Sequence, residues 1–143
     1  MSLFVVDANV AVKWFLPARS ETLTDEALEL FRRFARGDVR FTVPDLFWAE
    51  FANVLSKAVR LGRFPKASAE AALASLSERE LPTVPSLTLL DTAFQIAMAF
   101  DRTAYDSLYV ALAVHSKAQL ITADERLASS LAAHFPVKWL GAV

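Results

Sequence analysis

Short runs of apolar, β-type residues alternate along this chain with longer stretches of helical periodicity, and this alternation limits the possible folds more than any other feature. The runs at 3–6 and 119–122 are almost unbroken, which is typical of strands buried on both faces of a parallel sheet. Strands that alternate with helices favour one α/β domain with a mostly parallel sheet. We expect strands at 3–6, 39–43, 82–84, 119–122 and 137–140, and helices at 8–16, 21–36, 46–61, 66–79, 87–99, 104–117 and 125–133.

Length and composition predict a single domain over residues 1–143 and exclude several kinds of site. The chain has 143 residues, 55% of them hydrophobic, which is enough for one substantial core. Its formal charge is −1, so any polyanion that it binds must be held locally. The lack of cysteine and the presence of only two histidines leave oxygen atoms as the available metal ligands. We find no charged and apolar leader and no long apolar span, so we expect an intact cytoplasmic protein that crosses no membrane.

Two connections, at 46–79 and 87–117, each contain one helix more than a simple wound sheet requires. The first pair is predicted to form a helical hairpin that protrudes from the core. Its apolar side chains exceed what the two helices can cover by themselves, so we expect a partner surface there. These side chains are Phe47, Trp48, Phe51, Val54, Leu55, Val59, Leu73 and Leu76.

Four carboxylates are predicted to meet at one edge of the sheet. Asp7 follows the run at 3–6 directly, and Asp124 follows the run at 119–122, so both lie at carboxyl ends of strands, where open α/β sheets gather ligands. Asp106 begins the helix that leads into the second of these strands, and its first turn therefore lies over the same edge. Glu50 lies about one turn into the helix at 46–61, where it interrupts an apolar stretch.

Such a cluster of acids needs a counter-charge. Two like charges about 4 Å apart repel by roughly 4 kcal/mol at an effective dielectric constant near 20, and several such pairs would consume much of the stability of a small domain. A divalent cation removes this repulsion. Carboxylates and water without Cys or His are the ligands that Mg²⁺ or Mn²⁺ prefers, which indicates metal-assisted hydrolysis of a phosphodiester.

Helix capping is the simpler alternative for several of these residues. Thr103 and Asp106 have the spacing of a capping box, and Asp7 could serve only as the N-cap of the helix that starts at residue 8. Asp45, after Pro44, is expected to cap the helix at 46–61. Asp101 is expected in a loop on the same side as the four acids, as an accessory. The residues alone leave capping and catalysis open.

Four motifs, in this order, resemble the PIN-domain ribonucleases and most closely the VapC-type toxins of toxin–antitoxin pairs. They are VVDANV, DLFWAEFANVL, TAYDSLYVALA and LITADERL, and they span nearly the whole chain. The most specific part is Tyr-Asp-x-Leu-Tyr-x-Ala-Leu-Ala followed by Thr-Ala-Asp, although Ser107 stands where alanine is common in the family. The resemblance implies a three-layer α/β/α domain with a five-stranded parallel sheet, and Mg²⁺- or Mn²⁺-dependent cleavage of single-stranded RNA.

The resemblance also implies roles for individual residues. Asp7, Glu50, Asp106 and Asp124 match the acidic positions of the family, and Asn9 and Thr122 match its small polar companions. Our hypothesis is that the three aspartates hold one or two metal ions, and that Glu50 ligates a second ion or positions the attacking water. We also expect the protein to form a homodimer. A cognate antitoxin is expected to inhibit it by placing an arginine in the acid cluster.

Three other functions fit parts of the sequence. A phosphatase with an aspartyl nucleophile also opens with a strand that ends in aspartate, but it needs a second acid where this chain has Asn9. A non-catalytic binding module needs no cluster of acids. A chromosomal RNA-processing nuclease of the same fold shares every motif and differs only in its biological role.

Overall fold

A computed structural model describes residues 2–143, which form one five-stranded, wholly parallel sheet in the order β3-β2-β1-β4-β5. The expected α/β class and parallel sheet are confirmed, and β1 and β4 are neighbours as the grouping of the acids requires. Val6 pairs with Ile121, so Asp7 and Thr122 stand side by side at the carboxyl edge. The strands are β1 (Ser2–Val6), β2 (Val39–Pro44), β3 (Thr83–Val84), β4 (Gln119–Thr122) and β5 (Val137–Trp139).

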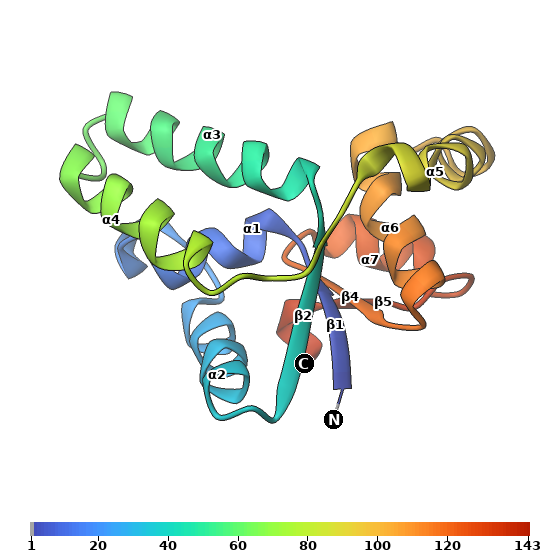
Figure 1. The fold of residues 1–143 in the computed structure, drawn as a ribbon, viewed down its shortest axis with the longest axis horizontal. Helices are drawn as coiled ribbons and strands as arrows, with labels where there is room; N and C mark the ends of the chain where they lie inside the picture. Colours follow the sequence, from blue (N-terminus) through green and yellow to red (C-terminus); the bar gives the residue numbers. More distant parts are fainter. Residues whose placement is uncertain (1) are drawn as a thin grey trace.

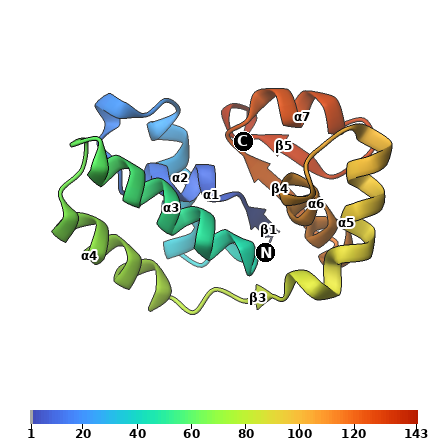
Figure 2. The ribbon, with the colours of Figure 1, turned by 90° about the horizontal axis from the view of Figure 1, so that it is seen from above.

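Helices cover the sheet on both sides, with α1 to α4 on one side and α5 to α7 on the other (Figures 1 and 2). Their bounds are α1 (Ala8–Ala11), α2 (Thr24–Ala35), α3 (Leu46–Arg60), α4 (Lys66–Ser77), α5 (Ser86–Phe100), α6 (Ala104–Ser116) and α7 (Glu125–Leu131). Short 3-10 turns are η1 (Val12–Trp14), η2 (Ala18–Ser20) and η3 (Leu140–Ala142). None of the helices within residues 2–143 is both long and apolar enough to cross a membrane.

Two expected helices are shorter than the periodicity predicts. The helix expected at 8–16 tightens into η1 after Ala11, and the helix expected at 21–36 begins only at Thr24. Leu23, the residue before α2, lies in the left-handed region with φ of 56°, which a continuous α-helix does not allow. The spacing of apolar residues indicates which face of a helix is buried. It does not reveal a residue such as Leu23 whose backbone angles interrupt the helix.

The α3–α4 hairpin is present (Figure 2), and most of the apolar surface that the two helices cannot cover by themselves is covered by the rest of the chain, so the partner surface expected there stays a prediction. Phe47, Phe51, Leu55 and Leu76 are buried, and Phe15 packs edge-on against Phe51 with their ring centroids 5.8 Å apart. The hairpin therefore closes over α1 and η1 and belongs to the core. Among the described residues, Val54 and Leu61 of the hairpin are exposed, and further exposed apolar side chains form a stripe along α5, namely Leu87, Leu90, Phe94 and Met98.

Asp45 does not cap α3 as expected. It has helical backbone angles and its side chain makes no bond to the first turn of α3. Its carboxylate instead accepts hydrogen bonds from the backbone N–H and the hydroxyl of Ser86, the first residue of α5, and these bonds lower the pKa of Asp45. The residue thus ties the start of α3 to the start of α5.

Candidate active site

Asp7 lies at the junction of β1 and α1 and is almost completely buried, with 7% of its surface exposed. Its Oδ1 accepts the backbone N–H of Asn9 at 3.2 Å, which makes it the N-cap of α1. Its Oδ2 accepts the hydroxyl of Thr122, the last residue of β4, at 3.0 Å. The capping interpretation is therefore correct as geometry, and the neighbouring strand fixes the orientation of the same carboxylate.

Asn9 and Thr122, predicted as accessories, lie beside Asp7 in one hydrogen-bonded network. The Asn9 Nδ2 donates to Thr122 Oγ1 at 3.3 Å, and the Asn9 Oδ1 accepts the backbone N–H of Ala123 at 3.0 Å. Thr122 Oγ1 also accepts the backbone N–H of Asp124 at 3.1 Å. These bonds join the start of α1 to the turn after β4. The segments that carry Asp7 and Asp124 are therefore held together.

Asp106 and Asp124 lie at the starts of two further helices. Thr103 is the N-cap of α6 and accepts the backbone N–H of Asp106 at 3.0 Å, and a side-chain hydrogen bond with Thr103 also lowers the pKa of the half-buried carboxylate of Asp106. Asp124 is the N-cap of α7, because its Oδ1 accepts the N–H of Leu127 at 3.1 Å. Capping thus explains the position of Asp124 more fully than that of Asp106.

Tyr109 is a component of the site that the sequence analysis missed. Its buried phenol donates to Glu50 Oε1 at 2.6 Å and accepts the backbone N–H of Ala8 at 3.4 Å. Burial raises the pKa of Tyr109, with further contributions from the charge of Asp7 and from Glu50, so the phenol stays a donor. The signal in the sequence was its position three residues after Asp106, which places both on one face of α6.

The ionisation of these acids shows that they share one electrostatic environment. Burial raises the pKa of Asp7 to about 7, against hydrogen bonds from Asn9 and Thr122 that lower it, and the charges of Glu50 and Asp106 raise it further. Burial and the charge of Asp106 raise the pKa of Glu50, although the Tyr109 hydrogen bond opposes them. Burial and then the charge of Asp124 raise the pKa of Asp106, and the Thr103 hydrogen bond and then the charge of Arg102 partly offset this rise. All four predicted acids therefore interact at this edge of the sheet.

This donor set fits a hard divalent cation. It consists of carboxylates that repel one another. The hydroxyl of Thr122 donates to Asp7 and accepts the N–H groups of Asn9 and Asp124, so it orients Asp7 and is not itself free to bind an ion. Within residues 2–143, no three Asp, Glu or His side chains converge closely enough to enclose an ion by themselves. Mg²⁺ does not require such a cage, because it keeps several waters and contacts only one or two carboxylates directly.

Asp101 is the one proposed accessory that the structure does not join to the cluster. It is exposed, ends α5 in the left-handed conformation with φ of 53°, and forms no hydrogen bond or ion pair with the four acids among the described residues. Its participation remains a prediction.

Glu50 opens onto an adjacent pocket of about 390 Å³ between the start of α3 and the start of α6. Leu46, Ala49 and Asn53 line it on the α3 side, and Tyr105, whose ring is exposed, lines it on the other. The site therefore has an entrance that offers both a carboxylate and a flat aromatic face.

Comparisons with known proteins agree with this fold. The family model described as PIN domain matches residues 4–130. The chain is similar to the crystal structure of PAE2754 from Pyrobaculum aerophilum, with 20% identity, 99% of this chain and 85% of that chain covered, and a TM-score of 0.67.

Two further solved structures are similar over nearly their whole length. VapBC2 from Rickettsia felis, bound to a promoter DNA fragment, has 13% identity over 96% of this chain and 98% of that chain, with a TM-score of 0.65. VapC20 from Mycobacterium tuberculosis, a toxin that cleaves the sarcin–ricin loop, has 16% identity over 92% and 95%, with a TM-score of 0.66. No curated protein sequence matches the chain.

The raised pKa of Asp7 predicts how pH changes the stability of the metal-free protein. Because the folded-state pKa of about 7 exceeds the ordinary value of 3.8, the folded state binds the extra proton between these values. Stability therefore falls as pH rises from about 4 to about 7, by at most about 4 kcal/mol. In Asp7→Asn this fall should become clearly shallower, because only the raised pKa values of Glu50 and Asp106 then contribute, as measured by urea unfolding in EDTA across that range.

The matched control is Asp91→Asn, which changes an exposed aspartate on α5 and should keep the wild-type pH dependence. If Asp7→Asn loses stability with rising pH as steeply as the wild type does, Asp7 is not the buried titrating group.

Proposed function

Because this chain belongs to the PIN domain family, we propose that it is a metal-dependent endoribonuclease that acts as the toxin of a toxin–antitoxin pair. PIN domains are typically nucleases. The observation that supports the proposal is that Asp7, Glu50 and Asp106 come from three different elements to the carboxyl edge of β1 and β4. The charges of Glu50 and Asp106 raise the pKa of Asp7 there, and the charge of Asp106 raises the pKa of Glu50. Helix capping alone does not require that acids from three different elements lie at one edge of the sheet.

In the proposed mechanism, Asp7, Asp106 and Asp124 would hold Mg²⁺ or Mn²⁺, directly or through its bound waters, and Thr122 and Asn9 keep the Asp7 carboxylate in one orientation. The bound ion supplies positive charge for the phosphate and lowers the pKa of a water molecule. Tyr109 engages Oε1 of Glu50, which leaves Oε2 to orient the attacking water and accept its proton. The exposed ring of Tyr105 offers a stacking surface for a base beside the scissile bond. The leaving group is the 3′ oxygen.

The toxin role rests on the similarity to the VapC structures together with the acid cluster. We propose single-stranded RNA as the substrate and a cognate antitoxin protein as the partner that restrains cleavage. An arginine from this partner, placed among the acids, would form charge-assisted hydrogen bonds and compete with the metal. Inhibition would then follow directly from binding.

Loss of any one acid should abolish most of the RNA cleavage. Glu50→Gln, Asp106→Asn and Asp124→Asn are each expected to lower the rate at least about a hundredfold with Mn²⁺, the scale for a group that supports a metal or a proton transfer. Asp91→Asn should cleave at the wild-type rate, and Asp101→Asn should fall between. The measurement is cleavage of labelled RNA, with thermal melting of each variant to confirm folding.

Expression in bacteria separates the toxin from the RNA-processing nuclease. Wild-type protein alone should arrest growth, and Asp106→Asn should not. A protein that cuts RNA but leaves growth unchanged would instead be an RNA-processing nuclease. If Asp106→Asn loses only about 1 kcal/mol of stability and keeps its activity, the residue is no more than part of a helix start.

We also propose that the protein forms a homodimer. Its contact surface is expected on α5 and not on the α3–α4 hairpin. Leu87, Leu90, Phe94 and Met98 form an exposed apolar stripe with one acidic neighbour, Asp91, and homodimer interfaces are the most apolar of protein interfaces.

Light scattering across a concentration series should give the mass of a dimer for the wild type. Phe94→Glu should give a folded monomer, because it places a charge in the stripe. Leu55→Glu should instead unfold the chain, since Leu55 is buried in the core. A wild type that stays monomeric at high concentration would rule out the dimer.

A further inference from the structure

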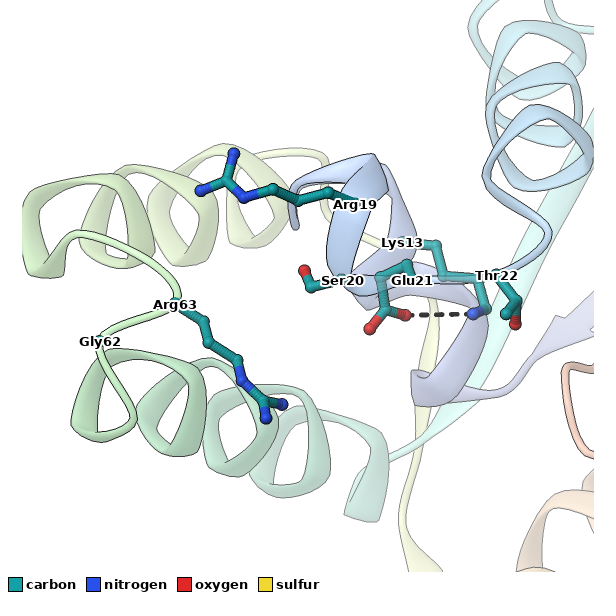
Figure 3. A pocket seen from close by; sticks show the side chains of 7 residues that line it. All are labelled: Lys13, Arg19, Ser20, Glu21, Thr22, Gly62 and Arg63. Carbon is teal, nitrogen blue, oxygen red and sulfur yellow. Dashed lines mark hydrogen bonds and ion pairs between the residues drawn. The ribbon is translucent and has the colours of Figure 1, made fainter.

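A second, basic pocket lies away from the acid cluster, between η2 and the turn that joins α3 to α4 (Figure 3). It has a volume of about 740 Å³ and is open to solvent. Lys13 and Glu21 form an ion pair of 3.1 Å at one end, and Arg19 and Arg63 come from its two opposite sides. A smaller pocket of about 160 Å³ shares Ser20, Glu21 and Arg63 with it and adds Lys57 of α3. We call the two together the basic groove.

The basic groove carries an excess of positive charge in a chain whose net charge is −1. Its four basic side chains face a single acid, Glu21, which Lys13 already neutralises. Among the described residues, Arg19, Lys57 and Arg63 take part in no ion pair. Three cations are therefore available to a ligand, and such a local cluster is what an overall neutral protein needs to hold a polyanion.

The backbone fixes both sides of the groove. Gly62 adopts φ of 71° and ends α3, and the N–H of Arg63 donates to the carbonyl of Ala58 at 2.9 Å, which is a Schellman C-cap. On the other side, the hydroxyl of Ser20 donates to the carbonyl of Pro17 at 2.9 Å and closes the turn of η2. The positions from which Arg19 and Arg63 project are thus set by local hydrogen bonds.

Two helical segments lead from the acid cluster to the basic groove. One starts at Asp7 and reaches Lys13 through α1 and η1, and the other starts near Glu50 and reaches Lys57 along α3. Glu50, Asn53 and Lys57 have the spacing of one helix face, and Asn53 lines the pocket beside the acids. At about 1.5 Å per residue, Lys57 lies about 10 Å along α3 from Glu50, within reach of one bound strand.

We propose that the basic groove binds backbone phosphates of the RNA strand whose neighbouring phosphodiester lies at the acid cluster. This inference rests on the proposed ribonuclease function. Guanidinium groups such as those of Arg19 and Arg63 bind phosphate through paired hydrogen bonds, and the hydroxyl of Thr22 is a donor of the kind that contacts nucleic-acid backbones. The acid cluster repels the same strand wherever no cation intervenes, so affinity must come from a separate surface.

The test removes two charges from the groove and measures RNA binding without cleavage. The double variant Arg19→Gln/Arg63→Gln is titrated with a fluorescent single-stranded RNA in EDTA, at several salt concentrations, and binding is followed by anisotropy. We expect about tenfold weaker binding at moderate salt. The slope of log K against log salt should become shallower by about 1.4, about 0.7 for each lost phosphate contact. Melting temperature should be unchanged, because both side chains are exposed and unpaired.

The control double variant is Arg40→Gln/Lys117→Gln, which changes net charge equally. Arg40 and Lys117 are exposed and lie at the opposite, amino-terminal end of the sheet. If both double variants weaken binding equally, the effect is one of net charge and the groove assignment is overturned. Unchanged RNA binding in Arg19→Gln/Arg63→Gln overturns it as well.

Two outcomes separate this inference from its alternatives. If the groove variant keeps full RNA affinity but loses a co-expressed antitoxin, the groove binds a protein segment and not RNA. If wild-type protein binds RNA through the groove but does not cut it with Mn²⁺, the groove assignment stands while the proposed nuclease function fails.

Discussion

The burial of the Asp7 carboxylate beside other acids is the constraint around which the site is arranged. Neutral donors hold each acid in place: Thr122 and Asn9 for Asp7, Tyr109 for Glu50, Thr103 for Asp106, and the first turn of α7 for Asp124. The four ion pairs found among residues 2–143 all lie elsewhere. The fold thus fixes the positions of these carboxylates but leaves most of their mutual repulsion uncompensated, which is the electrostatic property that a cation site requires.

The sheet and the grouping of the acids could be predicted because they depend on local patterns. The apolar runs before Asp7 and Asp124 predict strands that end at one edge, and helices that begin there place Glu50 and Asp106 above it. Contacts between distant parts of the chain could not be predicted. The Tyr109–Glu50 hydrogen bond joins residues 59 positions apart, and Asp45 bonds to Ser86 across 41 positions. The sequence likewise predicts an apolar face on α3, but it does not show that α1 and η1 cover this face.

The acid cluster and the basic groove lie at separate places on the molecule. The four acids lie at the carboxyl edge of the sheet, and the basic groove lies at the far ends of the segments that lead away from it. A net charge of −1 conceals this division. In a nuclease the separation has a clear physical reason, because the site that activates water must carry negative charge, whereas the surface that grips the substrate must carry positive charge. One polyanionic strand can meet both requirements only if it spans the two regions.

Calorimetric titration with Mn²⁺ near pH 7, in two buffers of different ionisation enthalpy, tests the central claim that the acid cluster is a cation site. Because burial raises the pKa of Asp7 to about 7, part of the molecules carry its proton at this pH, and a bound ion must displace it. The expected result is saturable binding accompanied by release of protons. Heat that does not saturate would contradict the claim.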